Sequence, residues 1–91
     1  MAEAIQERQG TDQVYEWLRA EAAARGVPAT IYSLAAKQEG RFLIVPVHLA
    51  GMSDAFDFAA ALQDLEDAYN NQQPKPDWLL ILRPAAAPRN G

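Results

Sequence analysis

Two short apolar runs on either side of one helix-patterned, acidic segment constrain the fold of this 91-residue chain most strongly. The first run covers residues 42–49 (FLIVPVHL) and the second covers residues 78–82 (WLLIL). Both are short and rich in branched or aromatic residues, which is typical of buried strands. The segment between them has apolar residues at the three-and-four spacing of one helix face, namely Phe58, Leu62, Leu65 and Tyr69. The sequence therefore predicts a strand–helix–strand unit.

A second helical pattern precedes the first apolar run. Its apolar stripe consists of Val14, Trp17, Leu18 and Ala22. Gly26 is a suitable stop, because glycine adopts the left-handed conformation that often ends a helix. We therefore expect a first helix that starts near residue 11 and ends at Gly26.

Residues 29–36 are predicted to form one strand that pairs with residues 42–49 through a tight turn. A two-residue loop at positions 39 and 40 places Leu34 opposite Val45, so that apolar residues of both strands share one face. The expected fold is an α/β (α+β) two-layer sandwich with the order α-β-β-α-β. It has a three-stranded sheet with both helices on one face.

The other face of this predicted sheet has no cover within the chain. Exposed apolar patches of that kind usually mark an interface. Pro46 lacks a backbone donor, which places it on an edge strand or at a bulge. Trp78 follows two prolines at the start of the last strand, where exposure is easier. We predict an association interface made of Ile31, Phe42, Ile44, Pro46 and Trp78. Association would form a homodimer, or a complex with another protein, through this face or an exposed edge strand.

Composition limits the chain to one domain. Residues 11–83 are expected to fold, whereas residues 1–10 and 84–91 are expected to be flexible, because they are poor in apolar bulk. There is no cysteine, so disulfides and thiolate metal sites are excluded. No signal peptide or membrane-length apolar run is recognisable, and a soluble cytoplasmic protein is the expectation.

The charge balance is acidic. Net charge is −4, and residues 51–91 carry six acids against three bases, which makes nucleic acid an unlikely partner. Three of those acids, Asp57, Asp64 and Asp67, form an acidic surface on the outward side of the second helix. A solvated helix face or a contact for a basic partner explains them. A specific cation site does not, because residues seven apart lie about 10 Å apart along a helix.

His48 is the only side chain whose ordinary pKa lies near neutrality. With Asp54 and Asp57 it would form the centre of a small metal-assisted or hydrolytic enzyme, which is the alternative function. No second histidine, nucleophile elbow or glycine-rich phosphate loop supports such chemistry. A third reading is binding of single-stranded RNA, with Phe42 and Trp78 as stacking platforms. We expect instead a non-enzymatic protein–protein interaction or regulatory module with no catalytic residues, metal or cofactor.

Overall fold

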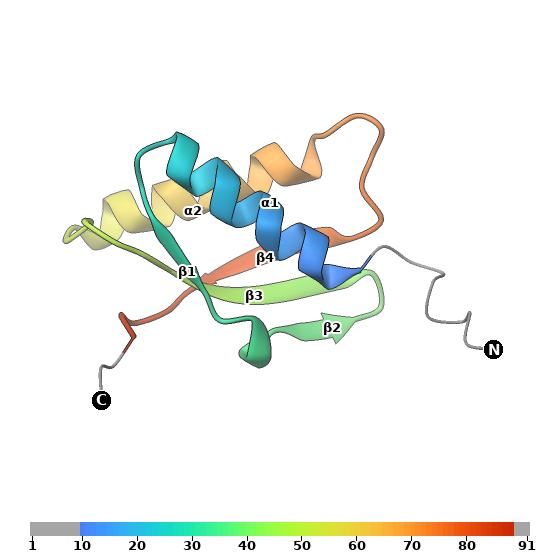
Figure 1. The fold of residues 1–91 in the computed structure, drawn as a ribbon, viewed down its shortest axis with the longest axis horizontal. Helices are drawn as coiled ribbons and strands as arrows, with labels where there is room; N and C mark the ends of the chain where they lie inside the picture. Colours follow the sequence, from blue (N-terminus) through green and yellow to red (C-terminus); the bar gives the residue numbers. More distant parts are fainter. Residues whose placement is uncertain (1–9, 89–91) are drawn as a thin grey trace.

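The structure is a computed structural model and describes residues 10–88 (Figure 1). Two helices, α1 (Thr11–Ala24) and α2 (Ala55–Asn70), lie on one side of a four-stranded sheet. The strands are β1 (Ala29–Ile31), β2 (Lys37–Glu39), β3 (Phe42–Leu49) and β4 (Leu79–Pro84), and a one-turn 3-10 helix (Ser33–Ala35) separates β1 from β2. This confirms the predicted two-layer α+β sandwich, although the sheet has one strand more than expected.

Strand β3 is the centre of the sheet. Both β1 and β2 pair with it antiparallel, whereas β4 pairs with it in parallel. The Pro46 carbonyl accepts from Tyr32 beside β1, and the Val47 carbonyl accepts from Ala85 beside β4. Successive residues of a strand point their backbone groups to opposite edges, so β4 occupies one edge of β3 and β1 and β2 share the other.

The strand predicted at residues 29–36 is a strand only in β1, and β2 lies beyond the predicted range. The chain breaks after β1 opposite Pro46. The Pro46 carbonyl accepts from the Tyr32 amide at 3.0 Å, but proline has no N–H to return to the Tyr32 carbonyl. That carbonyl accepts instead from Ala35 at 3.0 Å, and this bond forms the 3-10 turn between β1 and β2. Pro46 thus interrupts the ladder, as its missing donor predicts, although β3 is a central strand.

The interruption changes the register, and two predictions are wrong because of it. Ile31 lies opposite Val47 and packs against the core beneath the helices, so it is not on the uncovered face. Leu34 lies in the 3-10 turn and is fully exposed rather than buried opposite Val45. The tight turn is also shifted by one residue from the loop predicted at positions 39 and 40, because Glu39 pairs with Phe42.

The core lies between the helices and one face of the sheet. In β3 the odd-numbered residues are fully buried and the even-numbered ones are partly or largely exposed. The helix stripes fill the other half of the core as predicted, except that Tyr15 is buried whereas Trp17 is half-buried. The buried residues of the helices are Val14, Tyr15, Leu18, Ala22, Leu62, Leu65 and Tyr69.

The predicted flexible ends are residues 1–10 and 84–91, of which residues 1–9 and 89–91 lie outside the described part. Strand β4 continues through Pro84, one residue past the predicted boundary, and the Ala85 amide donates to the Val47 carbonyl at 2.9 Å. The boundary expected at residue 83 is therefore one strand residue short.

Candidate interaction face

One face of the sheet carries an apolar strip that none of the described helices covers. The strip consists of Phe42, Ile44 and Pro46 of β3 with Leu79 and Ile81 of β4, and we call these five residues the open face. The parallel register places Phe42 beside Leu79 and Ile44 beside Ile81. Phe42 is 43% exposed and Leu79 is 37% exposed, so both offer apolar area to a partner.

Charged residues border the open face. The strand register places Glu39 beside Phe42, Lys37 beside Ile44 and Arg83 beside Pro46. All three are exposed. A strip of aliphatic and aromatic side chains bounded by charge has the anatomy of an interface, with an apolar centre and a polar rim.

Of the five predicted interface residues, the structure places Phe42, Ile44 and Pro46 together on the open face. Trp78 is not with them: it is only 2% exposed and belongs to the hydrophobic core. Side chains alternate along a strand, so Trp78 points to the same side of the sheet as Leu80, which is the side that the helices cover. The expectation of an exposed Trp78 is wrong. Leu79 and Ile81 of β4 lie on the open face instead. The parallel pairing with β3 determines that these two side chains, and not those that alternate with them, face outward.

Hydrogen bonds hold the segment that follows β4 close to Pro46. The Tyr32 hydroxyl donates to the Ala86 carbonyl at 2.8 Å, and His48 Nδ1 lies 3.0 Å from the Ala85 carbonyl. A hollow of about 590 Å³ lies between this segment, Tyr32 and Pro46. The alanine-rich sequence carries no pattern from which these contacts could be predicted.

The residues of the enzymatic alternative have other roles in the described structure. A carbonyl oxygen can only accept, so His48 carries its proton on Nδ1 toward Ala85. The Asp54 carboxylate caps α2 by accepting from the Phe56 amide at 2.8 Å, and Asp57 is exposed in the first turn. Within residues 10–88, no group of three histidine, aspartate or glutamate side chains is arranged to hold a metal ion.

The predicted acidic surface lies on the opposite layer of the sandwich. Asp57, Asp64 and Asp67 are exposed on α2, and Asp67 accepts a hydrogen bond from Gln63 at 3.0 Å. These three carboxylates are therefore separated from the open face by the thickness of the sheet and core.

Side chains of α2 cover the outer edge of β4. The Asn70 amide bonds to Leu80 twice: its Oδ1 accepts from the Leu80 N–H at 2.8 Å, and its Nδ2 donates to the Leu80 carbonyl at 3.0 Å. Glu66 Oε2 accepts from the Leu82 amide at 3.2 Å. Unpaired edge groups are a template for adding another strand, and here α2 side chains bond to the Leu80 N–H, the Leu80 carbonyl and the Leu82 N–H. This leaves the sheet face, rather than the β4 edge, for association.

Replacing Asn70 with alanine is expected to reduce the free energy of unfolding by about 1–3 kcal/mol, because two backbone groups of Leu80 lose their partner. Urea denaturation followed by circular dichroism measures this change. Asn71→Ala is the matched control, since Asn71 is exposed at the end of the same helix. Equal stability of the two variants would contradict the role given to Asn70.

The contribution of the Glu66 carboxyl makes the stability of the fold at the β4 edge dependent on pH. Burial raises the pKa of the Glu66 carboxyl, the hydrogen bond from Leu82 lowers it, and the charge of Asp67 raises it, with a net increase above the ordinary 4.5. A raised folded pKa means that the contribution of Glu66 to stability is present below 4.5 and is lost as the pH rises through the folded value.

We therefore expect Glu66→Gln to gain stability relative to the parent chain as the pH is raised from about 4 to about 7. Urea denaturation at both pH values measures this difference. Asp64→Asn, an exposed change on the same helix, controls for removal of one negative charge. A relative stability of Glu66→Gln that falls with pH would contradict the assignment.

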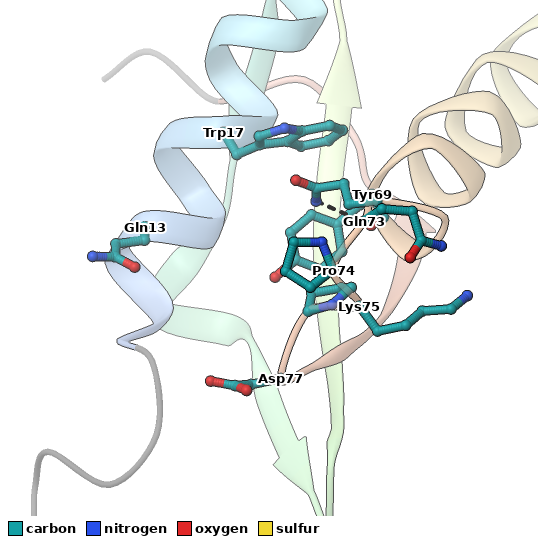
Figure 2. A pocket seen from close by; sticks show the side chains of 9 residues that line it. Gln13, Trp17, Tyr69, Gln73, Pro74, Lys75 and Asp77 are labelled. Carbon is teal, nitrogen blue, oxygen red and sulfur yellow. Dashed lines mark hydrogen bonds between the residues drawn. The ribbon is translucent and has the colours of Figure 1, made fainter.

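A second concave site lies on the helix side, between α1 and the loop after α2. It has a volume of about 340 Å³ and contains the rings of Trp17 and Tyr69, whose centroids are 5.3 Å apart in an edge-to-face arrangement. Figure 2 shows Trp17 above Tyr69 and Pro74, with Asp77 at the far end and the Lys75 chain directed away. Burial raises the pKa of Tyr69, and the charge of Asp77 raises it further. No motif in the sequence indicates this pocket.

Comparison with known proteins finds no matching family model, no similar curated protein and no similar solved structure. Among the described residues, neither helix has the length and apolar character needed to cross a membrane.

Proposed function

We propose that this protein is a non-enzymatic protein-association module whose binding surface is the open face. The observation that carries the proposal is the paired strip Phe42, Leu79, Ile44 and Ile81, which is apolar yet uncovered in the described chain. Contiguous exposed apolar surface of this kind is typical of binding sites in soluble proteins, whereas single exposed apolar residues are not.

The layering of the fold supports this use of the sheet. Both helices pack against the odd-numbered residues of β3, so the side with Phe42, Ile44 and Pro46 is left without a covering helix. Phe42 lies on this surface and is the natural anchor, because aromatic side chains dominate binding energy in interfaces. The occupied edge of β4 further favours face-to-face docking over strand addition.

The partner is either a second copy of the chain or another protein. His48 and Asp54 each have a structural hydrogen bond that explains their presence, so the enzymatic alternative gains no support from them. A module that binds through apolar side chains needs neither metal nor cofactor.

Hydroxyl-radical footprinting read by mass spectrometry tests the proposal. The chain is oxidised alone at low concentration, alone at high concentration, and with a blocked hexapeptide that alternates leucine and glutamine. Protection of Phe42 and Leu79 in either of the last two conditions is the expected result, with Phe56 on α2 as an exposed internal control. Protection confined to the helices, or no protection in any condition, would overturn the proposal.

A further inference from the structure

The basic residues are unevenly distributed over the two layers. Of the six lysines and arginines within residues 10–88, Arg19 and Arg25 lie on α1 and pair with Glu16 at 3.4 Å and Glu21 at 3.1 Å. The other four are associated with the sheet, and they are Lys37, Arg41, Lys75 and Arg83.

These four cations surround the open face. Lys37 and Arg83 lie on it by register, beside Ile44 and Pro46. Arg41 and Lys75 line a hollow of about 300 Å³ at the edge of the sheet, which extends from Leu79 of the open face to Asn70 and Trp78. Cations therefore lie on the β2 side of the apolar strip and at both of its ends, and Glu39 beside Phe42 is the one acid that the strands place at its border.

Acidic residues show the opposite distribution. Of the ten acids within residues 10–88, Glu39 is the only one in the four strands and Asp54 and Asp77 lie in loops, whereas the helices carry Asp12, Glu16, Glu21, Asp57, Asp64, Glu66 and Asp67. Although the chain has a net charge of −4, the described residues place more cations than acids around the apolar face. Charge patterns around an apolar centre select partners and fix their register.

From this charge pattern we infer that the open face docks an acidic, apolar segment of another protein rather than a second copy of itself. The inference rests on the proposed function and identifies the partner. In a symmetric dimer the same patch meets itself, so the four cations and the one carboxylate, Glu39, would meet an identical set, and the two surfaces would carry net charge of the same sign. A partner segment that alternates apolar side chains and carboxylates places its apolar side chains on the strip and its carboxylates beside the surrounding cations.

The hollow beside Leu79 gives the partner a specific anchor. The Arg41 guanidinium has a planar set of donors that matches a carboxylate in a two-point contact. Lys75 Nζ makes one long bond, 3.4 Å to the Asn70 carbonyl, and an ammonium group has three donors. A carboxylate of the partner therefore fits between these two cations while its neighbouring apolar side chain covers Leu79.

Nucleic acid fits the same surface less well, although it too is anionic. Binding of single strands depends on aromatic platforms for the bases. Phe42 is the only aromatic residue of the open face, the nearby Tyr32 hydroxyl is held by Ala86, and the remaining strip is aliphatic. Aliphatic side chains are complementary to apolar protein side chains.

The test measures the affinity of three fluorescein-labelled probes by anisotropy: a blocked hexapeptide alternating leucine and glutamate, its leucine–glutamine analogue, and oligouridylate. The leucine–glutamate peptide is expected to bind most tightly. Lys37→Gln/Arg83→Gln should weaken its binding about fivefold, the effect expected for losing two exposed ion pairs. Arg19→Gln/Arg25→Gln changes the net charge equally on the other layer and should leave binding unchanged.

The outcomes separate this inference from the proposed function. Equal affinity for both peptides, or concentration-dependent dimerisation in light scattering that Phe42→Asp abolishes, would overturn the acidic partner but retain association through the open face. Tighter binding of oligouridylate than of either peptide would overturn both. Equal weakening by the two double variants would assign the effect to net charge and overturn the role of the rim. No binding of the leucine–glutamate peptide up to millimolar concentration would also overturn the inference.

Discussion

Replacing Trp78 with alanine is expected to reduce the free energy of unfolding by about 3–5 kcal/mol, the usual cost of deleting a buried aromatic side chain. Trp78 is 2% exposed and packs in the cluster that joins both helices to the sheet. A domain of this size is stabilised by only about 5–15 kcal/mol, so this change removes a large part of the total. Urea denaturation followed by circular dichroism measures the loss.

The control for this prediction is Phe42→Ala on the open face. Phe42 is 43% exposed, so its truncation should cost well under half as much as that of Trp78. If Trp78→Ala fails to fold, Trp78→Phe retains most of the apolar volume and keeps the comparison measurable. A cost for Trp78→Ala no larger than that of Phe42→Ala would mean that Trp78 is exposed, which contradicts the structure.

Replacing Phe42 with aspartate, or Ile44 with aspartate, is expected to weaken partner binding at least about thirtyfold, as loss of a central interface anchor does. Either change places a charge in the middle of the apolar strip, where a docked partner would exclude water. Phe42→Asp should reduce fold stability less than Ile44→Asp, because Phe42 is 43% exposed whereas Ile44 is partly buried. Anisotropy with the leucine–glutamate hexapeptide measures binding, and circular dichroism checks the fold.

Phe56→Asp is the matched control for these two variants. Phe56 is 81% exposed in the first turn of α2, so the same chemical change is made on the other layer of the sandwich. An aspartate near a helix N-terminus is also compatible with the helix dipole. Phe56→Asp should bind the hexapeptide like the parent chain. Weakening by Phe56→Asp equal to that by Phe42→Asp would contradict an interface on the sheet.

The strand–helix–strand unit was predictable because its periodicities are strong and local. The β3 and β4 runs and the α2 stripe lie at the expected positions, and the alternation in β3 correctly separates Leu43 and Val45 from Phe42 and Ile44. In a strand that is buried on one face, every second residue is apolar, so the buried face can be identified from a single sequence.

The first half of the sheet was not predictable in detail, because its register depends on one missing hydrogen bond. Because Pro46 has no N–H to donate to the Tyr32 carbonyl, that carbonyl accepts from Ala35 and the chain forms a 3-10 turn, and the register before this turn places Ile31 on the core side. Trp78 was misplaced because residues 78–82 are apolar at every position, so only pairing with β3 decides which alternate set faces the helices. Contacts of Asn70 and Ala86 with distant backbone groups have no sequence signal at all.

Isoleucine-methyl NMR tests the central claim most directly, because the described chain places its isoleucines on both faces of the sheet. Ile44 and Ile81 belong to the open face, whereas Ile31 packs against the core beneath the helices. On addition of the leucine–glutamate hexapeptide, the account predicts that the Ile44 and Ile81 methyl signals shift together and saturate while that of Ile31 stays in place. Unchanged Ile44 and Ile81 signals, or a shift at Ile31 alone, would contradict an open sheet face that binds protein.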